Sequence, residues 1–414
     1  MTKFDVVVIG GGPGGASAAY WLATAGHRVL LVEKKVFPRE KTCGDGLTPR
    51  AVHQLNTMGL GPQLSKYHRY DGLRALGHGR SLDMRWPQHS VFPDYGYVVR
   101  RCDLDTMVAD HAVAAGATMW QGCEAVEPIM DGAVVSGVKL KHKDATTDRA
   151  CEVRAAYVIV AEGANSRFGR QLGTVRNKTY PQGMAIRAYY ESPLHADPWI
   201  ESSLDVRDRH GNSMPGYGWI FPVGNGTINV GIGLLSTFRD WKSINTSHIM
   251  SEWAATLPAY WEIDPETPIA APTGGRLPMG GSINPKSGPN WVAIGDSAGS
   301  INPFNGEGID YAYETGHMAA TLIDTCLRID SPLPLRRYES MLTEEYGEYF
   351  KVARMFAKVI GNPTLMTQLT KVGMRSQPLM SWVLAIMANL MREDKLGPPE
   401  AIYKSAALLL RPWS

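Results

Sequence analysis

The chain has 414 residues, a length that at roughly 150 residues per domain suggests two or three domains. Apolar residues make up 44% and charged residues 20%, so the composition is globular and excludes a disordered or fibrous protein. The 42 basic and 40 acidic residues leave a formal charge of +2, which argues against a dedicated nucleic-acid binder. The five cysteines show no C-x-x-C spacing and the histidines no H-E-x-x-H spacing, so we expect neither a disulfide framework nor a metal site.

Two features of the sequence bear on where the protein lies in the cell. The N-terminus lacks a basic region followed by an apolar run and a cleavage site, so no signal peptide is expected. No uncharged apolar run reaches the ~18 residues that a spanning helix needs. We therefore expect a cytoplasmic protein that is not integral to a membrane.

The first elements of the chain form a recognisable order. Residues 4–9 are a short apolar run typical of a buried parallel strand. Glycines follow at once, and residues 16–26 favour a helix that ends at Gly26. A second apolar run at 29–32 closes on Glu33. The order is therefore strand, glycine-rich turn, helix, strand and acid.

The rest of the chain holds two kinds of segment. We expect a helix leading into a strand over 104–119, and short buried strands at 157–161 and 291–294. A further helix is expected to begin near Gly308. Residues 181–235 differ, because they hold longer β-rich stretches with many aromatic residues and few helix signals.

The glycine-rich turn fits the dinucleotide fingerprint G-x-G-x-x-G, and its candidate cofactor-binding residues are Gly10, Gly12, Pro13, Gly14 and Gly15. The first glycine of the fingerprint allows the tight turn, the second lets a pyrophosphate approach the backbone, and the third lets the helix pack on the strand. The helix N-terminus would face the phosphates with free N–H groups. Glu33 lies 18 residues after Gly15, where its carboxylate can accept hydrogen bonds from ribose hydroxyls.

Three further segments resemble the FAD-dependent oxidoreductases related to p-hydroxybenzoate hydroxylase. Residues 291–299 (WVAIGDSAG) are a strand ending in Gly-Asp, and the resemblance implies that Asp296 binds the ribityl chain of FAD. Residues 160–167 (VAEGANSR) resemble that family's second motif, with Glu162 in place of the usual Asp. Arg101 sits where the family has an arginine that contacts FAD. The resemblance implies further cofactor contacts at Lys34, Val126, Gly163, Gly295, Gly306, Gly308 and Ile309.

Within that superfamily the chain resembles the geranylgeranyl reductases. The segments that carry this resemblance are 41–47 (KTCGDGL), 215–222 (PGYGWIFP) and 302–309 (NPFNGEGI). Their longer forms, CGDGLTPRA, PGYGWIFPVGNG and NGEGIDYAYETG, look most like those of the bacterial menaquinone reductases, which saturate an isoprenoid double bond in the quinone's side chain. The resemblance implies FAD as cofactor and a prenyl lipid, menaquinone first, as substrate.

The resemblance also implies a fold and a division of the chain. We expect an α/β protein with a Rossmann-type FAD-binding domain like that of p-hydroxybenzoate hydroxylase, an inserted antiparallel β-sheet substrate domain and a C-terminal helical region. The predicted ranges are 1–72, 100–180 and 276–350 for the FAD-binding domain, 73–99 and 181–275 for the substrate domain, and 351–414 for the C-terminal region.

Reduction of an unconjugated alkene needs a hydride and a proton on adjacent carbons, and the proton must come from a positioned acid or an ordered water. The resemblance places Cys43 near the flavin, and a thiol of pKa about 8.5 can donate a proton or hold water. Asp45 is a second candidate catalytic acid. Structural alternatives remain open for both, since a free cysteine is commonly a small buried hydrophobe and an aspartate commonly stabilises a turn.

The aromatic segment has two interpretations. Tyr217, Trp219 and Phe221 alternate, so on a strand they share one face. That face is either sheet core or, together with Pro222, the wall of a tunnel for an isoprenoid chain. Because the lipid leaves a membrane rather than water, such a tunnel must be comparably apolar, and the enzyme is expected to dock at the bilayer.

The C-terminal region has a basic excess, with nine Lys or Arg against three acids in the last 64 residues. Its apolar residues at helical spacing are Leu379, Trp382, Val383, Ile386, Met387 and Leu390. The cations flanking them are Lys371, Arg375, Arg392 and Lys395. Such a helix either lies on the cytoplasmic face of a membrane or packs on its own domain with solvated charges.

Several rival functions stay open. A reductase of geranylgeranyl diphosphate or geranylgeranyl lipids is the nearest alternative, and an FAD-dependent aromatic monooxygenase uses the same fold. A flavin halogenase would carry a Trp-x-Trp-x-Ile-Pro segment, which the chain lacks. A flavin-binding sensor or assembly factor is the non-enzyme alternative. The chain shows no second dinucleotide fingerprint, so NAD(P)H and reduced ferredoxin both remain candidate electron donors, and the oligomeric state is open.

Overall fold

The computed structural model describes residues 3–143, 148–207, 211–212, 214, 216–238, 246–392, 394 and 396–409. Its first sheet has seven strands in the order β8-β2-β1-β11-β10-β9, with β19 paired to β11. These strands are β1 Lys3–Ile9, β2 Val29–Glu33, β8 Thr118–Gln121, β9 Cys123–Asp131, β10 Val134–Lys143, β11 Asp148–Val160 and β19 Trp291–Ala293. The pairs among β8, β2, β1, β11 and β19 are parallel, and β9, β10 and β11 form an antiparallel meander.

Strand β1 is apolar throughout because both of its faces are covered. Val6 and Val8 join a core formed with helices, whereas Val7 and Ile9 join a core formed with the meander and Phe168. Successive side chains of a strand point to opposite faces, so this alternation requires an unbroken apolar run.

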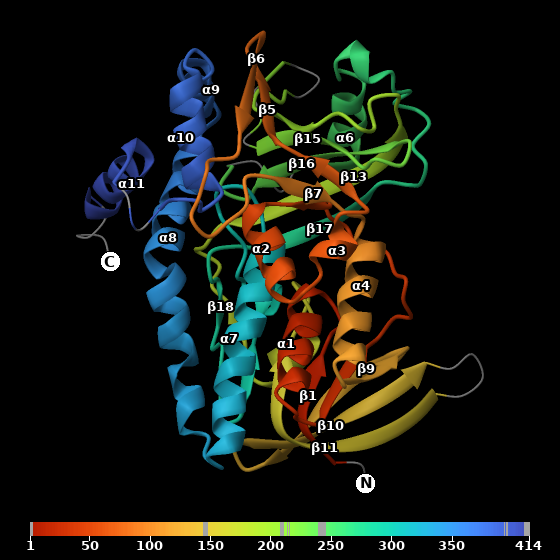
Figure 1. The fold of residues 1–414 in the computed structure, drawn as a ribbon. Coiled ribbons are helices and arrows are strands. Elements are labelled where there is room, and N and C mark those ends of the chain that lie inside the picture. Colours follow the sequence, from red (N-terminus) through yellow and green to blue (C-terminus); the bar gives the residue numbers. More distant parts are fainter. Residues whose placement is uncertain are drawn as a thin grey trace.

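Helices cover one face of the first sheet. They are α1 Pro13–Thr24, α4 Arg101–Ala114, α7 Ile309–Arg328 and α8 Tyr338–Ile360. Figure 1 shows α8, α7, α1 and α4 side by side in the lower half of the molecule. Buried residues of α1, α7 and α8 complete the core on this face of β1.

The second sheet forms the upper half of the molecule in Figure 1. It has the strand order β17-β13-β16-β15-β14-β5-β6. Its strands are β5 Gly72–Gly77, β6 Arg80–Arg85, β13 Gln182–Glu191, β14 Trp199–Ser203, β15 Gly216–Pro222, β16 Thr227–Leu235 and β17 Thr273–Pro278. One face packs on helix α6, Thr246–Ala254, through Trp253, Ile220 and Val230. The opposite face is turned toward the glycine-rich loops of the first sheet, because Phe221 of β15 contacts Gly44 and Gly46.

Short elements connect the two halves. A three-stranded sheet joins β3 Gly46–Leu47, β7 Gly96–Val98 and β4 His68–Tyr70, and a two-stranded one joins β12 Val175–Arg176 and β18 Ile283–Asn284. The short helices are α2 Pro49–Thr57, α3 Gly61–Leu64, α5 Arg167–Gln171, η2 Ala259–Trp261, η3 Gly295–Ala298 and η4 Leu333–Arg337.

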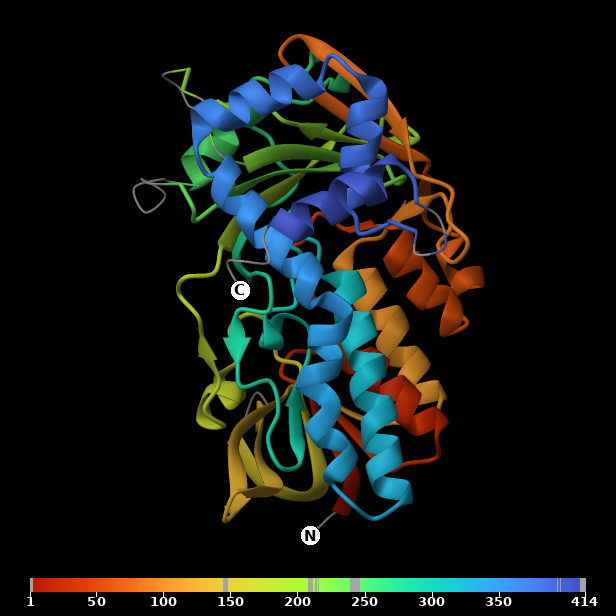
Figure 2. The same cartoon turned by 90° about the vertical axis from the view of Figure 1, so that its left-hand side faces the viewer.

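Three helices end the described chain: α9 Pro363–Gly373, α10 Gln377–Met387 and α11 Pro398–Leu409. Figure 2 shows them on the side of the molecule that faces the viewer, at the upper end of α8. Helix α10 packs on its own protein, since Met380 and Leu384 are buried against Met84 of β6. The apolar residues predicted from spacing are different ones: Leu390 is buried in this same core, Ile386 and Met387 lie half-buried against the first core, and Leu379, Trp382 and Val383 are half-buried. Part of the predicted face thus packs on the protein itself, and docking of this region on a membrane stays a prediction. Of the predicted flanking cations, Lys395 lies outside the described residues.

The predicted fold class is confirmed, with differences in detail. The strand expected at 157–161 is the end of the longer β11, and the helix expected from residue 104 already begins at Arg101. The second sheet is antiparallel except for the pair of β14 with β5. These two strands come from separate insertions, so no hairpin fixes their relative direction. The residue boundaries of the domains remain predictions.

The close approach of α1 and α7 gives a stability prediction. A Cβ on Gly316 of α7 would lie 2.6 Å from the carbonyl oxygen of Gly14, which is fixed backbone. We expect Gly316→Ala to lower the free energy of unfolding by about 1–3 kcal/mol through overpacking. Gly347 lies within helix α8, and a Cβ built there would meet only the side chain of the exposed Thr343. Gly347→Ala should therefore raise the free energy of unfolding by about 0.5–1 kcal/mol. Chemical denaturation of both variants measures the two signs, and an equal effect would contradict the packing argument.

Candidate active site

Three loops meet at one edge of the first sheet. Parallel pairing sets Ile9 of β1 beside Val32 of β2 and Val160 of β11, and Val160 beside Ala293 of β19. Since the strands run in the same direction, the glycine-rich turn, the Glu162 loop and the Gly295–Asp296 loop all leave from this edge. Ligands of open α/β sheets bind at the carboxyl ends of the strands.

The glycine-rich turn is shaped by close backbone contacts. Gly10 has φ +106°, a conformation that L side chains rarely adopt, and its Cβ would overlap the carbonyl of Ala161. A Cβ on Gly15 would overlap the carbonyl of Gly10. The predicted reasons for the first and third glycines, a tight turn and the packing of helix on strand, are both observed.

The N-terminus of α1 carries no side-chain cap and no acid in its first turn. The nearest side-chain atoms to a Cβ built on Gly12 are guanidinium nitrogens of Arg39, at 3.7 Å, and of Arg101, at 3.9 Å. Arg39 also contacts Asp105 at 2.9 Å, and its buried Nε has no hydrogen-bond partner. Free helix N–H groups beside two guanidiniums suit a pyrophosphate.

Glu33 is fixed at the end of β2. Its carboxylate accepts hydrogen bonds from the backbone N–H of Gly11 and of Lys35, both at 3.0 Å, and lies 3.4 Å from Arg39. The group is buried at the sheet edge, where the dinucleotide fingerprint expects a ribose contact. Lys34, which follows it, is exposed.

The second and third loops are bonded together. Gly163 and Ser297 exchange hydrogen bonds of 3.0 and 3.2 Å. The carboxylate of Glu162 serves its own loop, because it accepts from Ser166 at 2.6 Å and from the backbone N–H of Phe168 at 2.9 Å at the start of α5. Val126 lies half-buried on β9, and its carbonyl accepts from Gln171 at 2.6 Å.

Asp296 is a carboxylate without a protein donor. No hydrogen bond to its side chain occurs among the described residues, and burial raises its pKa although Lys41 and Arg101 oppose the rise. A Cβ on Gly308, which caps α7, would lie 3.4 Å from Asp296 Oδ1. The residue is half-buried, so its carboxylate can accept hydrogen bonds from a ligand that donates, such as the hydroxyls of a ribityl chain.

The Cys43–Gly46 turn is held by Asp45. Its Oδ2 accepts from the Tyr189 hydroxyl at 2.5 Å and from the Asn229 amide at 2.8 Å, and its Oδ1 accepts from the backbone N–H of Arg101 at 3.3 Å. Burial raises the pKa of Asp45 to about 6, whereas these two side-chain donors favour its charged form. Asp45 therefore joins the first half of the molecule to strands of the second sheet.

Cys43 lies half-buried in this turn, and its carbonyl accepts from Asn229 at 2.9 Å. Burial raises the pKa of the Cys43 thiol, and the Arg101 guanidinium offsets part of that rise. The thiol therefore stays protonated at neutral pH.

The aromatic residues of β15 share one face, as predicted. The rings of Tyr217 and Trp219 are 6.0 Å apart and those of Trp219 and Phe221 are 6.3 Å apart. A Cβ on Gly44 or Gly46 would lie 3.1 or 3.0 Å from the Phe221 ring, so the glycines make room for it. The face therefore packs on the cysteine turn rather than on α6. Of the surrounding motif, Pro215 lies outside the described residues, and Pro222 is buried.

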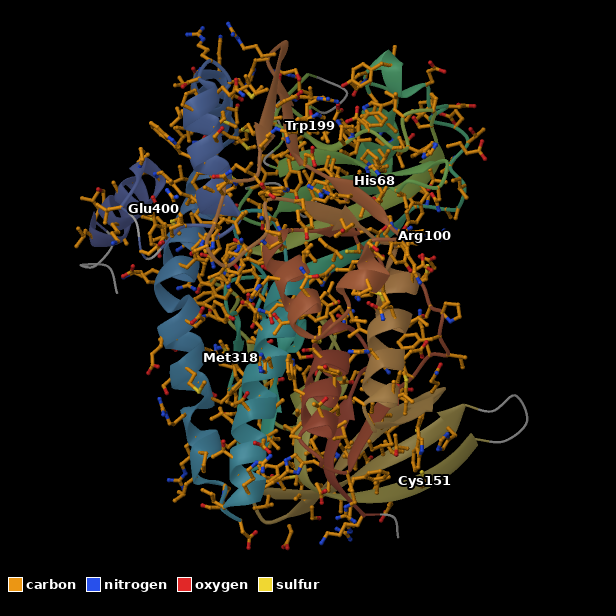
Figure 3. The ribbon with its side chains drawn as sticks, viewed as in Figure 1. His68, Arg100, Cys151, Trp199, Met318 and Glu400 are labelled. Carbon is orange, nitrogen blue, oxygen red and sulfur yellow. The ribbon has the colours of Figure 1, made fainter. Side chains whose placement is uncertain are left out.

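The two halves also meet around Arg100 and Arg187, whose guanidiniums lie 4.7 and 4.3 Å from the centre of the Tyr189 ring. Both also bond to Glu40, at 2.8 and 3.1 Å. Figure 3 shows Arg100 at the level where α4 reaches the upper sheet, and Cys151 far from it near the lower end of the molecule. Cys151 is thus remote from the site.

Several of these residues have no local sequence signal. Tyr189 and Asn229 lie on β13 and β16, and only the register of the second sheet brings them to Asp45. Arg39 could have been suspected from its place shortly after Glu33. Glu307 lies within a quoted motif, as an acid between two glycines at a helix start, and was not singled out.

Comparison with known proteins decides the family. Residues 3–223 match the family model described as FAD binding domain. The chain belongs to this family. It binds FAD, and the loops described above are where the fold offers a site.

Relatives narrow the family further. The chain is 41% identical over 409 residues to the menaquinone reductase of Mycobacterium tuberculosis H37Rv, covering 98% of this chain and 96% of that one. It is 30% identical over 364 residues to digeranylgeranylglycerophospholipid reductase 1 of Methanopyrus kandleri, covering 86% and 91%. It therefore belongs to the geranylgeranyl reductase group of the family.

Solved structures agree on the fold. A geranylgeranyl bacteriochlorophyll reductase-like protein of Thermoplasma acidophilum superposes with a TM-score of 0.80 at 23% identity, covering 98% of this chain and all of that one. A flavin-dependent brominase reaches a TM-score of 0.73 at 20% identity over the whole of both chains. At these identities the likeness concerns architecture alone.

The free carboxylate of Asp296 gives a binding prediction. We expect Asp296→Ala to weaken FAD binding by about 10- to 100-fold, the loss of a hydrogen bond to a charged acceptor. Asp94→Ala, at an exposed aspartate outside the three loops, is the control and should bind FAD as the wild type does. Fluorescence titration of apoprotein with FAD measures both, and equal affinities would remove Asp296 from the cofactor site.

Proposed function

We propose that this protein is an FAD-dependent reductase that saturates a carbon–carbon double bond in the isoprenoid chain of a prenyl lipid, with menaquinone as the first candidate. The observation that carries the proposal is the aromatic face of β15, which lies against the cysteine turn at the cofactor edge. The names of the relatives, menaquinone reductase and digeranylgeranylglycerophospholipid reductase, support a prenyl substrate.

The cofactor residues follow from the three loops. The α1 N-terminus with Arg39 and Arg101 would bind the pyrophosphate, Glu33 a ribose and Asp296 the ribityl chain. The backbone from Gly306 to Ile309 would face the ring system with the N-terminus of α7. Bound FAD supplies the hydride once it has been reduced.

The chain's own residues would shape the substrate side. Tyr217, Trp219 and Phe221 would offer an apolar wall to the isoprenoid chain. Pro222, predicted with them, pairs with Ile228 and so lies on the opposite face, toward α6. Asp45 holds the turn that carries Cys43, and the un-ionised Cys43 thiol would pack at the reacting double bond. Both residues thus belong to the proposed catalytic centre: Cys43 would contact the substrate, and Asp45 would position the turn that carries Cys43.

Anaerobic turnover tests the function. Purified protein, loaded with FAD and reduced chemically without oxygen, should add two hydrogen atoms to a short-chain menaquinone, detected by mass spectrometry. A monooxygenase or a halogenase would need oxygen, and a sensor would give no product. Finding only oxygenated product in air, and none without oxygen, would end the reductase proposal. Parallel assays with geranylgeranyl diphosphate and a geranylgeranyl lipid separate the substrate alternatives.

Cys43 gives a more specific prediction. We expect Cys43→Ala to keep bound FAD and to lower the turnover rate by about 10- to 100-fold, since small displacements at a reacting centre have such effects. Cys43→Ser keeps a side chain of similar volume that can donate a hydrogen bond, so its turnover rate should fall less. An unchanged kcat for Cys43→Ala would return this residue to a structural role.

We assign the membrane contact to helix α9 rather than to α10. Leu365, Leu369 and Val372 recur at helical spacing and are 41%, 46% and 58% exposed. Lys371 and Arg375 are exposed nearby, and the surrounding region has the basic excess given above. An apolar helix face beside cations suits an anionic lipid surface. Among the described residues no helix is long and apolar enough to cross a membrane.

Vesicle flotation tests this contact. The protein should float with vesicles that contain phosphatidylglycerol, and Val372→Asp should weaken binding by about tenfold, as expected when one valine no longer enters the lipid. Val175→Asp makes the same change at a valine 68% exposed on β12 and should leave flotation unaltered. Equal flotation of the two variants would place the membrane contact elsewhere.

A further inference from the structure

Three carboxyl groups at the start of α7 share one arginine. Glu307 precedes the helix, Asp310 lies in its first turn and Glu314 lies one turn later. Arg50 of α2 binds Glu314 through two hydrogen bonds of 2.8 Å, and the Tyr346 hydroxyl donates to the same carboxylate at 2.7 Å. The charge of Arg50 is therefore balanced by Glu314.

Asp310 is buried, and neither of its oxygens has a hydrogen-bond partner among the residues that the structure describes. The closest cationic atom, Arg50 Nε, is 3.8 Å from its Oδ2. Burial, together with Glu307 and Glu314, raises the pKa of Asp310 well above its usual range, which favours its neutral form. Besides the charge of Glu314, a second negative charge is therefore unfavourable among these three carboxyl groups.

Glu307 stands where the parts of the proposed site meet. The hydroxyl of Thr48, which follows the cysteine turn, donates to its Oε1. The Asn305 amide lies 3.4 Å from its Oε2, and the carbonyl of Asn305 accepts from the Tyr217 hydroxyl on the aromatic face. The next residue, Gly308, adjoins Asp296 at the cofactor edge. One carboxyl group therefore borders the turn, the aromatic face and the N-terminus of α7.

Asp45, Cys43 and Glu307 are the candidate acids near the proposed site, and they differ in how readily they can donate a proton. Asp45 has a pKa of about 6 and is bound by three donors, so at neutral pH it is mostly a carboxylate without a proton. The Cys43 thiol has a pKa above its usual value, which makes it a weak acid. Burial raises the pKa of Glu307 to about 7, against the hydrogen bond from Thr48. An acid works best when its pKa lies near the working pH, and Glu307 meets that condition.

We propose that Glu307 is the acid that protonates the double bond, a role that rests on the proposed function. One alkene carbon takes the hydride that reduced FAD supplies, and the other takes the Glu307 proton. The carbon–carbon π bond and the carboxyl O–H bond break while two C–H bonds form. The flavin is oxidised by two electrons, the alkene is reduced, and Glu307 remains as a carboxylate that regains a proton from solvent.

The ionisation of Glu307 responds to groups on several elements. Arg50 of α2 favours its charged form, and Glu314 of α7 opposes it. The other ionisable groups in electrostatic contact with it are Tyr70 of β4, Tyr217 of β15, Asp310 and Tyr311 of α7, and Tyr349 of α8. The pKa of each phenol is raised, and that of Asp310 is raised well above its usual range, so Glu307 is the member expected to titrate near pH 7.

Single-turnover kinetics test the assignment. FAD-loaded protein is reduced with dithionite under argon and mixed with a short-chain menaquinone across a pH series. In the wild type the rate of product formation should fall as the pH rises through about 7. Glu307→Gln should keep FAD, lose at least about 100-fold in rate and no longer show that fall. Thr48→Val removes a donor to the carboxylate, so its fall should move to higher pH.

Two controls separate the outcomes. Glu344→Gln, at an exposed position of α8, should keep the wild-type rate and profile, and Cys43→Ala should be slow but keep the fall. If the wild type forms product and Glu307→Gln shows the same rate and the same pH dependence, the role of Glu307 is overturned while the proposed function stands. Absence of product in the wild type would instead refute the proposed function.

A second test, which needs no turnover, follows from the linkage between the protonation of Glu307 and the stability of the fold. The folded-state pKa of Glu307 lies above its ordinary value of 4.5, so the unfolded chain loses this proton first. The group's contribution to stability is therefore lost as the pH rises from about 4.5 to about 7. Melting temperatures across that range should decline less in Glu307→Gln than in Glu344→Gln. Equal declines would show that Glu307 does not titrate in the fold as proposed.

Discussion

The parallel pairing of β1 with β11, and of β11 with β19, determines where everything else lies. It aligns Ile9, Val160 and Ala293, so that the three glycine-containing loops begin at one edge of the sheet. Each strand must be buried on both faces for this to occur, which explains the apolar run of β1 and the two cores on either side of it. The cofactor site is thus a consequence of strand direction rather than of any one motif.

Asp45 makes the second connection. Its carboxylate binds the backbone of α4 on one side and Tyr189 and Asn229 of the upper sheet on the other. This buried group couples the turn that carries Cys43 to the sheet that carries the aromatic face. The geometry between the cofactor edge and the aromatic face of β15 therefore depends on a buried polar contact, which is directional, and not on apolar packing alone.

Much of this arrangement could be predicted from the sequence where a local pattern had one physical cause. The glycines and Glu33 are indicated by their spacing, Asp296 by the resemblance of residues 291–299 to a family motif, and the alternation of Tyr217 to Phe221 fixes a shared face. The partners of Asp45 could not be found in this way, because Tyr189 and Asn229 become neighbours only through strand register. What the apolar side of α10 contacts stayed open for a related reason, since helical spacing shows which residues share a face but not what covers that face.

The raised pKa of Cys43 has a consequence for the protein's lifetime. Reduced flavins that meet dioxygen release hydrogen peroxide, and a cysteine reacts with peroxide as the thiolate, which attacks a peroxide oxygen. A thiol kept protonated by burial reacts slowly, so Cys43 in its proposed place beside the flavin would resist conversion to a sulfenic acid. The same burial that makes this sulfur a poor acid makes it durable.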